Sequence, residues 1–250
     1  MVKQLDPLSF VGLALAFGAV ALGQHLEGGT LAALVNGPAL LIVVGGSIGA
    51  TMLQSPLPVF VRALALLGWI FRPPVNDEDQ VLHDIVQWAQ LARRDGFLAL
   101  EKVAAKVTDP FARKGLQLVI DGNDPPAIRE TLELDSLAHE RRDMNAARVF
   151  DGIGAYAPTL GILGAVLGLI QVMNNLADPS RLGEGIAIAF VATVYGVGLA
   201  NLVFLPSANK LKALIREQSR RKELVAIGIV AIAEGENAQM VESRIQSLLV

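Results

Sequence analysis

Four long stretches of this chain contain no Asp, Glu, Lys or Arg, and this absence constrains the fold more than any other feature. The charge-free stretches are residues 7–26, 28–61, 152–177 and 185–205. Each can supply the roughly 20 apolar residues with which a helix crosses about 30 Å of hydrocarbon. We therefore expect an all-α integral membrane protein with four transmembrane helices, near residues 8–25, 35–54, 153–175 and 185–206.

The composition of the 250 residues supports a membrane protein. Hydrophobic residues make up 52% and charged residues 18% of the chain, with a mean hydropathy of +0.48, whereas a soluble domain carries about 25% charge. Aromatic residues are only 5%, so the apolar side chains are mainly the small and aliphatic ones with which membrane helices pack. These proportions exclude disorder and a disulfide-stapled module. The net charge of −3 gives no reason to expect nucleic acid as a partner.

The basic residues indicate an orientation in the membrane. Of the 21 Lys and Arg, 19 lie between residues 54 and 152 or after residue 206, and an even number of spans places both segments on one side. An excess of Lys and Arg marks the cytoplasmic side, so both termini are expected inside. The alternative for the first span is a cleaved signal peptide ending at Ala21-Leu22-Gly23. That alternative would leave three spans, and only Lys3 precedes the apolar run.

The segments outside the spans have helical patterns. Residues 57–71 are apolar but too short to span and contain Arg62, so we expect a helix along the inner leaflet with Trp69 at headgroup depth. Apolar spacing and Gly or Pro stop signals predict further helices at 80–94, 97–107, 111–120, 127–147, 207–223 and 228–250. The expected domains are transmembrane helices one and two (1–54), an interfacial helix with a cytoplasmic domain (55–152), transmembrane helices three and four (153–206), and cytoplasmic C-terminal helices (207–250).

The sequence does not favour an enzyme. It has three His, no Cys, no phosphate-binding loop and no pair of carboxylates in an apolar setting. The run Asp77-Glu78-Asp79 precedes a helical pattern, and a helix dipole favours acidic side chains in the first turn. A solvated helix N-terminus therefore explains this run better than a metal site does, and we expect no cofactor and no resident metal.

The spans contain no charged side chain, although an ion transporter usually carries one in the membrane. If this chain handles ions, the titrating carboxylate must therefore arrive on a partner's helix. Small residues four apart would let the spans approach closely. These pairs are Gly45/Gly49, Gly46/Ala50, Gly161/Ala165 and Gly164/Gly168.

Polar and kinking residues in the spans are few, and each has a structural as well as a functional explanation. A hydroxyl in a membrane helix can bond its own carbonyl four residues back, and Pro158 and Pro206 predict kinks that packing alone would also explain. The polar side chains are Tyr156, Thr159, Gln171, Thr193, Tyr195 and Asn201.

The run from Gly154 to Ile170, GAYAPTLGILGAVLGLI, resembles the third span of the flagellar stator A-subunits, the MotA/PomA family. The resemblance extends over essentially the whole chain. It includes four spans, a large segment between spans two and three, Pro206 at the end of span four, and the run LARRDGFLALE at residues 91–101. The related ExbB/TolQ proteins usually have three spans and are the weaker match.

The resemblance implies a set of partners. In this family a ring of A-subunits, thought to be five, surrounds two helices of a B-subunit of the MotB/PomB type, each with one membrane aspartate. Ion passage through that aspartate rotates the ring, which pushes on a rotor switch protein of the FliG type. The expected setting is therefore the bacterial inner membrane, in contact with lipid, and the expected process is torque generation for flagellar motility and chemotaxis.

The resemblance also implies roles for individual residues. Arg93 and Glu101 match the rotor-contacting charges, with Arg94 and Asp95 as auxiliaries. Because Gly96 lies between Arg93 and Glu101, these two residues could occupy neighbouring helix ends. Solvated surface charges are the plainer explanation, and such a pair adds under about 1 kcal/mol to stability. The residues expected to line or gate the ion path are Tyr156, Pro158, Thr159, Ala165, Thr193 and Pro206.

Residue 165 bears on the ion. Sodium-driven members carry a Thr seven residues after the proline of span three, where this chain has Ala165. A dehydrated Na⁺ needs several oxygen ligands, whereas a proton needs only the carboxylate, so the missing hydroxyl favours H⁺ over Na⁺. Backbone carbonyls could substitute for that hydroxyl, and the compact length of the chain is closer to sodium-type members.

Two other functions are open on the sequence. One is an ExbB/TolQ-like proton-driven energiser of envelope processes, from which the fourth span and the Arg93/Glu101 pair distinguish the stator. The other is a membrane scaffold that conducts nothing, against which association with a single-span protein bearing a membrane Asp would argue.

Overall fold

The computed structural model describes residues 5–75, 77–174 and 179–249, and within these ranges the chain is helical and contains no strand. Four helices in the described part are long and apolar enough to cross a membrane: Pro7–Leu26, Gly37–Gln54, Pro125–Asn174 and Gly185–Ala233. The expectation of four spans is therefore confirmed. The predicted end of span three at residue 175 and the loop residue Asp178 lie outside the described residues.

Two helices are longer than the sequence pattern predicted. Helix α8 (Pro125–Asn174) joins the predicted cytoplasmic helix 127–147 to span three without a break. Helix α10 (Leu205–Ala233) likewise continues past residue 223, because residues 224–226 and Gly228 are packed in an apolar core that favours an unbroken helix. The chain turns only at Gly235, whose φ is +75°, before α11 (Ala238–Leu249).

The chain divides into two compact units. The first unit comprises residues 1–73 and 143–213, and the second comprises residues 74–142 and 214–250. Helices α8 and α10 contribute residues to both units.

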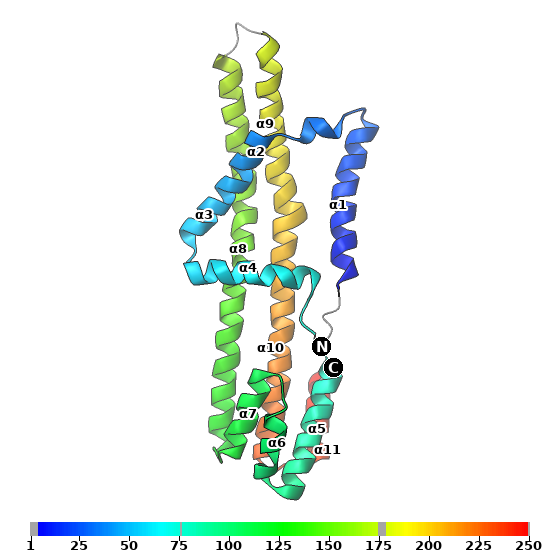
Figure 1. Cartoon of the computed structure of the whole chain (residues 1–250), viewed down its shortest axis with the longest axis vertical. Coiled ribbons are helices and arrows are strands. Elements are labelled where there is room, and N and C mark those ends of the chain that lie inside the picture. The colour runs from blue at the N-terminus through cyan, green and yellow to red at the C-terminus, as the bar shows by residue number, and fades with distance from the viewer. Residues whose placement is uncertain (1–4, 76, 175–178, 250) are drawn as a thin grey trace. The chain divides into compact units, whose positions relative to one another are not determined.

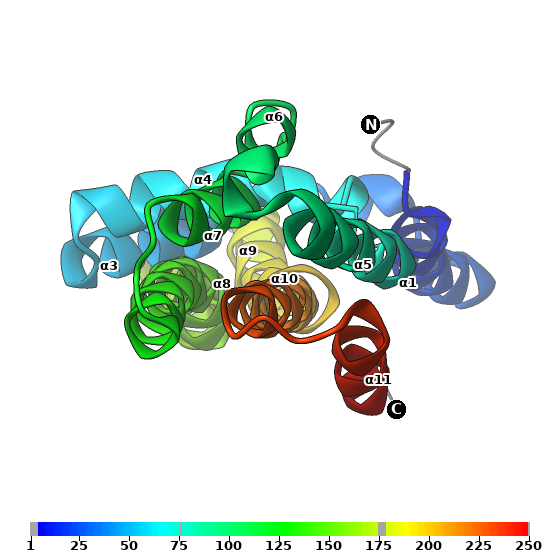
Figure 2. The ribbon, with the colours of Figure 1, turned by 90° about the horizontal axis from the view of Figure 1, so that it is seen from below.

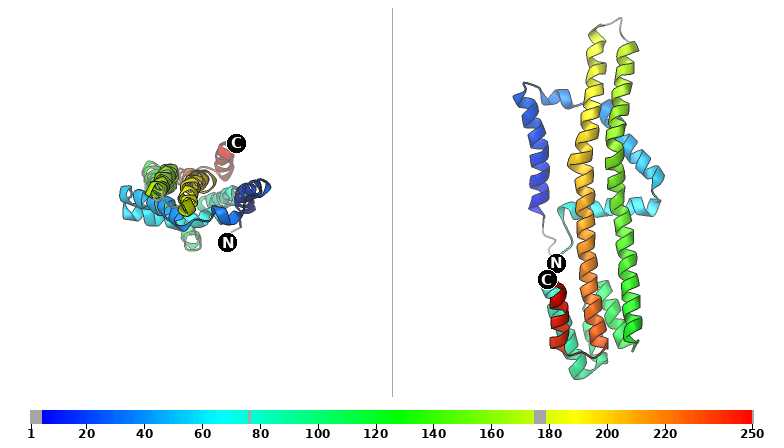
Figure 3. Two further views of the ribbon diagram at one scale, coloured as in Figure 1. Left: turned by 90° about the horizontal axis from the view of Figure 1, so that it is seen from above. Right: turned by 180° about the vertical axis from the view of Figure 1, so that it is seen from behind.

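The first unit is built around α8 and α9 (Pro179–Leu199), which lie side by side (Figures 1 and 3). Its core is made of small residues and Val; the buried members are Ala39, Val43, Ala157, Val191, Ala192 and Ala200. Span two packs on α9 and consists of α2 (Gly37–Leu40), a π-helical turn (Leu41–Gly45) and α3 (Gly46–Gln54). The Tyr195 hydroxyl holds the start of this span, since it donates to Leu34 O and accepts from the Asn36 N–H at 3.0 Å.

Helices α1 (Pro7–Leu26) and α4 (Leu57–Phe71) complete the first unit. Asp6 caps α1 by accepting from the Leu8 N–H, but no residue of α1 itself is buried. Helix α4 has the predicted bounds and crosses the direction of α8 (Figure 1). It buries Ala63, Leu66 and Ile70, and its exposed apolar residues are Leu57, Val61, Leu64 and Leu67.

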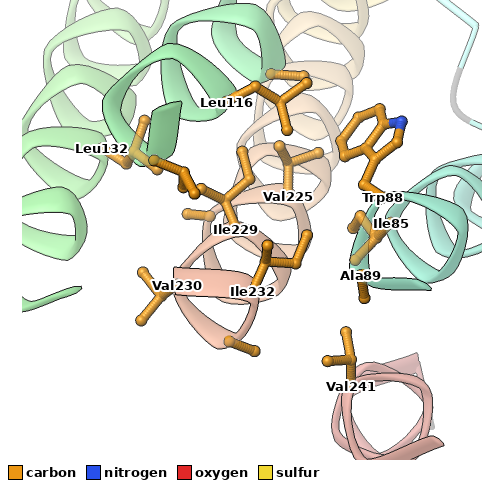
Figure 4. Close-up of a cluster of buried hydrophobic side chains, with 14 of the residues drawn as sticks. Ile85, Trp88, Ala89, Leu116, Leu132, Val225, Ile229, Val230, Ile232 and Val241 are labelled. Atoms are coloured by element: carbon orange, nitrogen blue, oxygen red, sulfur yellow. The ribbon is translucent and has the colours of Figure 1, made fainter. Parts of the chain in front are cut away.

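The second unit packs short helices around one apolar core, with α5 (Glu78–Asp95) against α11 and α6 (Glu101–Ala104) against α7 (Pro110–Ile120) (Figure 2). Side chains from α5, α7, α8 and α10 point toward one another in this core (Figure 4). The largest fully buried ones include Ile85, Leu116, Leu132 and Ile229. Asp77 accepts from the Gln80 N–H at 3.0 Å, so the acidic run is a capped helix N-terminus as the sequence indicated.

The predicted helix 97–107 is shorter than expected. It consists of a 3₁₀ turn (Phe97–Leu100) followed by the four residues of α6. The guanidinium of Arg113 donates twice to Val107 O, at 2.6 and 3.1 Å, and so stabilises the non-helical segment between α6 and α7. Asp109 and Pro110 then start α7, which requires extended backbone at Asp109.

Candidate functional site

Glycines bring the backbones of α8 and α9 into contact. A Cβ atom at Gly161 would lie 2.9 Å from Ala192 O, one at Gly168 would lie 2.7 Å from Gly185 O, and one at Gly196 would lie 2.6 Å from Ala157 O. Atoms that close cannot be accommodated without moving a backbone, so only glycine fits. We call this contact the α8–α9 seam.

The sequence predicted one side of the seam. Gly161, Gly164 and Gly168 of the predicted pairs do contact α9. Their partners on α9 were missed, although small residues recur there at helical spacing: Gly185, Ala189, Ala192 and Gly196. Gly46 packs against the Leu160 side chain, whereas a Cβ at Gly49 would meet nothing within 4 Å, so the Gly45/Gly49 pair does not pack within one chain.

The seam places several predicted ion-path residues close together. Gly196 contacts Pro158 and Ala157, and the Cα of Thr193 lies 3.4 Å from a Cβ built on Gly161. Thr193 is therefore within about one helical turn of Pro158 along α8. Ala165, half-buried, follows Gly161 by one further turn.

The hydroxyl groups of Thr193 and Thr159 bond within their own helices. Thr193 Oγ1 donates to Ala189 O at 3.2 Å and Thr159 Oγ1 donates to Tyr156 O at 2.8 Å, and both residues are exposed in the single chain. The Tyr156 hydroxyl reaches span two and donates to Gln54 Oε1 at 3.0 Å. Because a donating hydroxyl keeps its lone pairs, Thr159 and Thr193 can still accept a bond from water or an acid, or contact a cation.

The two prolines differ in their effect on the helices. Pro158 lies inside α8 without ending it, so the predicted kink does not interrupt that helix. Before Pro206 the chain forms a π-helical turn (Ala200–Phe204), and the Leu205 N–H donates to Ala200 O, five residues back. Proline cannot donate to the helix and its ring clashes with the preceding turn, which is relieved by such local widening. Gly154 faces Phe204 and Leu205, so Pro206 lies about one turn of α8 from Pro158.

Large apolar faces of both helices have no cover in the single chain. On α9, Phe190 is 72% exposed, and Ile186, Val194 and Val197 are exposed on the same stripe as Thr193. On α8 the exposed apolar residues are Ile162, Leu163, Val166, Leu167, Leu169, Ile170 and Met173. In water such faces would be an aggregation hazard, so lipid or other protein helices must cover them.

Ion pairs join the ends of the apolar segments in the first unit. Arg62 donates from Nε and Nη2 to the two carboxylate oxygens of Asp143, each at 2.8 Å, and its guanidinium carbon lies 5.8 Å from the centre of the Trp69 ring. Lys212 Nζ lies 2.5 Å from Asp151 Oδ2, and Lys210 donates to both Asp6 and Ser9. These pairs fasten α4, α8, α1 and α10 to one another.

The predicted rotor-contacting charges lie in the second unit at two neighbouring helix ends. Arg93 is in the last turn of α5 and Glu101 is the first residue of α6, and both are exposed. Gly96 separates the helices with a φ of +80°, a conformation that residues with a Cβ rarely adopt. Within the described part of the chain, no hydrogen bond or ion pair engages the side chain of Arg93 or Glu101.

Arg94 and Asp95 behave differently, because they pair with each other. The Arg94 guanidinium donates to both Asp95 oxygens, at 3.0 and 2.8 Å, and this bond lowers the pKa of the Asp95 carboxyl below its usual value. The two charges therefore cancel locally. Arg93 and Glu101, by contrast, have no such partner among the described residues.

Comparison with known proteins gives consistent matches along the chain. Residues 103–224 match the MotA/TolQ/ExbB proton channel family, and residues 10–96 match the Motility protein A N-terminal family. Motility protein A of Bacillus subtilis is 34% identical over 96% of this chain and 90% of its own length. Chemotaxis protein PomA of Vibrio alginolyticus is 31% identical, with 98% and 96% covered.

Solved structures show the same fold. A structure of C. jejuni MotAB has a TM-score of 0.92 and 28% identity, covering 98% of this chain and 96% of that one. The flagellar MotAB stator complex from Bacillus subtilis has a TM-score of 0.87 and 34% identity, covering 97% and 96%. The match to the N-terminal motility family over residues 10–96 includes the first two spans and favours a motility protein over an ExbB/TolQ-like energiser.

Proposed function

We propose how this chain works from the finding that it belongs to the Motility protein A family. It is a flagellar stator subunit that conducts ions together with a B-subunit. In this proposal, proton flow through the complex rotates a ring of these chains, and the ring turns the flagellar rotor. No bond chemistry and no resident cofactor are required for this activity.

The proposed location is the bacterial inner membrane, with both termini in the cytoplasm. The 19 basic residues on the segments 54–152 and 207–250 support this orientation. Helix α4 would lie on the inner leaflet, where its exposed Leu57, Val61 and Leu64 contact lipid. The ion pair of Arg62 with Asp143 keeps the only charge of this helix turned away from the apolar leaflet.

The proposed assembly is a ring of five chains around two B-subunit helices. The uncovered faces of α8 and α9 support it, because a single chain leaves most of these helices unburied. Neighbouring chains and the B-subunit helices would cover those faces. Thr193, on the exposed stripe of α9, would then face the membrane aspartate of the B-subunit.

A proton is the proposed ion. The spans provide no carboxylate of their own, and Ala165 provides no hydroxyl at the position where sodium-driven relatives carry one. A protonated aspartate needs few additional ligands. The hydroxyl oxygen of Thr193 or Thr159 can accept a hydrogen bond from the carboxylic acid.

The surface formed by Arg93 and Glu101 is the proposed contact with the rotor switch protein, of the FliG type. The observation that carries this proposal is that both charges are exposed and unpaired at rigid helix ends, while Arg94 and Asp95 neutralise each other. Charges at the rim of an interface mainly set the rate and specificity of encounter. Such a contact suits a motor that must bind and release at every step.

Reversing both charges tests the rotor assignment. Arg93→Glu combined with Glu101→Lys should abolish swimming, because the complementary partner surface is then repelled, while proton flux through the purified complex stays unchanged. The control reverses two exposed charges on α8, Arg141→Glu with Glu130→Lys, and should swim normally. Normal swimming of the Arg93/Glu101 variant would overturn the assignment.

A further inference from the structure

Two apolar side chains are exposed between the charges of the proposed rotor contact. Leu98 is 71% exposed and Phe97 is 38% exposed, and both lie on the 3₁₀ turn that joins α5 to α6. Single exposed leucines are common on protein surfaces and need no explanation. These two differ because they lie on the turn that connects the helix end carrying Arg93 to the helix start carrying Glu101.

The turn is held in place from both sides. Gly96 ends α5 with φ of +80°, and the Ala99 N–H donates to Gly96 O at 3.1 Å. Leu100 is fully buried and Ala92 is 7% exposed, so the turn is anchored in the core of the second unit. Leu98 therefore projects from a fixed backbone rather than from a loose loop.

An open hollow of about 540 Å³ lies between α5 and α6, the two helices that the turn joins. Its walls are Gln87, Trp88, Gln90, Leu91, Arg94 and Val103. Apolar carbon from Trp88, Leu91 and Val103 forms part of this wall, so a partner side chain can be accommodated between the two helices that carry Arg93 and Glu101. All of these residues belong to the second unit.

The arrangement is that of an apolar centre with a charged rim. Arg93 precedes the turn, Glu101 follows it, and neither has an intramolecular partner among the described residues. In protein interfaces a few central apolar or aromatic side chains carry most of the binding energy, whereas rim charges steer the approach. The second unit thus presents both parts of a docking surface.

We propose that Leu98, supported by Phe97, is the apolar anchor of the rotor contact. The occupant is a surface of the rotor switch protein that carries an acidic side chain to face Arg93, a basic one to face Glu101 and an apolar one between them to pack on Leu98. This inference rests on the proposed function. In this proposal, Arg93 and Glu101 select and steer the partner, and Leu98 determines the lifetime of the contact under load.

Substitutions of Leu98 in the full stator complex test the anchor. Cells lacking their own stator would express the chain with its B-subunit, and the readouts are torque on a bead-loaded flagellum and the dwell time of a fluorescently labelled stator at the motor. Leu98→Ala should shorten the dwell time at high load about tenfold, as expected for loss of a hot-spot side chain. Leu98→Met should remain close to the parent, and Leu98→Asp should stop rotation.

Two controls separate anchoring from folding. Leu134→Ala removes the same side chain at a position on α8 that is 60% exposed, and it should leave dwell time and torque unchanged. Proton flux and the amount of complex in the membrane should be unchanged for Leu98→Ala, because an exposed side chain adds little to stability.

The outcomes distinguish this inference from the proposed function. If Leu98→Ala has the parent's dwell time and torque while the Arg93/Glu101 reversal stops swimming, the anchor is wrong and the rotor contact stands. If the charge reversal also swims normally, the rotor contact itself is wrong. Equal loss in Leu98→Ala and Leu134→Ala would show a general effect on the fold and would also overturn the anchor.

Discussion

At position 165 a single methyl group stands close to the seam between α8 and α9. A hydroxyl there would add one oxygen to that of Thr193, which lies across the seam and keeps its lone pairs while it donates to Ala189 O. Cations such as Na⁺ need several oxygen ligands at once. A site with few oxygen atoms therefore favours a proton, which binds covalently to a single carboxylate.

Swimming should not depend on sodium. We expect equal swimming speed across Na⁺ concentrations at constant ionic strength, and loss of swimming with a proton uncoupler, because Ala165 provides no ligand. Ala165→Thr alone should not create sodium dependence, since one hydroxyl does not complete a coordination shell. A speed that rises with Na⁺ in the parent would contradict the proton assignment.

The α8–α9 seam is a property of two helices rather than of any one residue. Backbone contacts at Gly161, Gly168 and Gly196 let the helices approach more closely than side chains would permit. In lipid the hydrophobic effect does not drive helices together, because lipid tails are as apolar as the side chains. Close packing is therefore a main source of helix association. The seam also fixes Pro158 and Thr193 on facing turns.

Adding a side chain at Gly196 should damage the stator. Gly196→Val places carbon within 2.6 Å of Ala157 O, so the helices must separate, at a cost of about 1–3 kcal/mol from overpacking. We expect less complex in the membrane and loss of swimming, measured by immunoblot and motility assay. Gly198→Val is the matched control two residues along α9, where a Cβ meets nothing within 4 Å. Equal behaviour of the two variants would argue against a tight seam.

At the scale of the first unit, the attachment of α1 depends on polar contacts at one end. No residue of α1 is buried, but Lys210 reaches Asp6 and Ser9, and the Ser9 hydroxyl also donates to Ile70 O at 3.0 Å. The Asp6 N–H donates to Phe71 O at 3.0 Å, and the Phe10 and Phe71 rings lie 4.9 Å apart. One cluster thus joins the starts or ends of α1, α4 and α10 just after Pro206.

Exchanging the charges of this cluster tests its role in assembly. Lys210→Asp or Asp6→Lys alone should lower the melting temperature of the purified complex by about 2–4 °C, because two like charges then face each other. The double exchange should recover the part of that loss caused by like charges, but not the α1 cap, because a Lys at position 6 cannot accept the Leu8 N–H. Failure of the double exchange to recover any of it would show that the ion pair does not attach α1.

The pH dependence of this contact has a defined sign. The hydrogen bond from Lys210 is the main cause that lowers the pKa of the Asp6 carboxyl from its ordinary value of 3.8. A carboxyl whose pKa is lower in the folded state stabilises the fold above its unfolded pKa and loses that contribution as pH falls through the folded pKa. The contact therefore persists throughout the neutral range and is lost only in acid.

Much of the architecture was predictable because it depends on local sequence. A run of about 20 residues without charge is enough to predict a span, since each backbone group bonds within its own helix and the side chains face hydrocarbon. Caps such as Asp77 and stops such as Gly96 act within a few residues and were equally readable, whereas the turn at Gly235 was missed, because the predicted helix 228–250 runs through it. The continuity of α8 was not, because no local signal separates one long helix from two shorter ones.

The sequence by itself determined the number of spans, the segregation of basic residues and the separation of Arg93 from Glu101 by Gly96. Only the tertiary structure decided which glycines touch a backbone, that Arg62 pairs with Asp143, and that Lys210 meets Asp6 from 204 residues away. The physical reason is range. Hydrocarbon burial and helix bonding act on neighbours in the chain, whereas close packing and ion pairing depend on which distant segments the fold brings within a few ångströms.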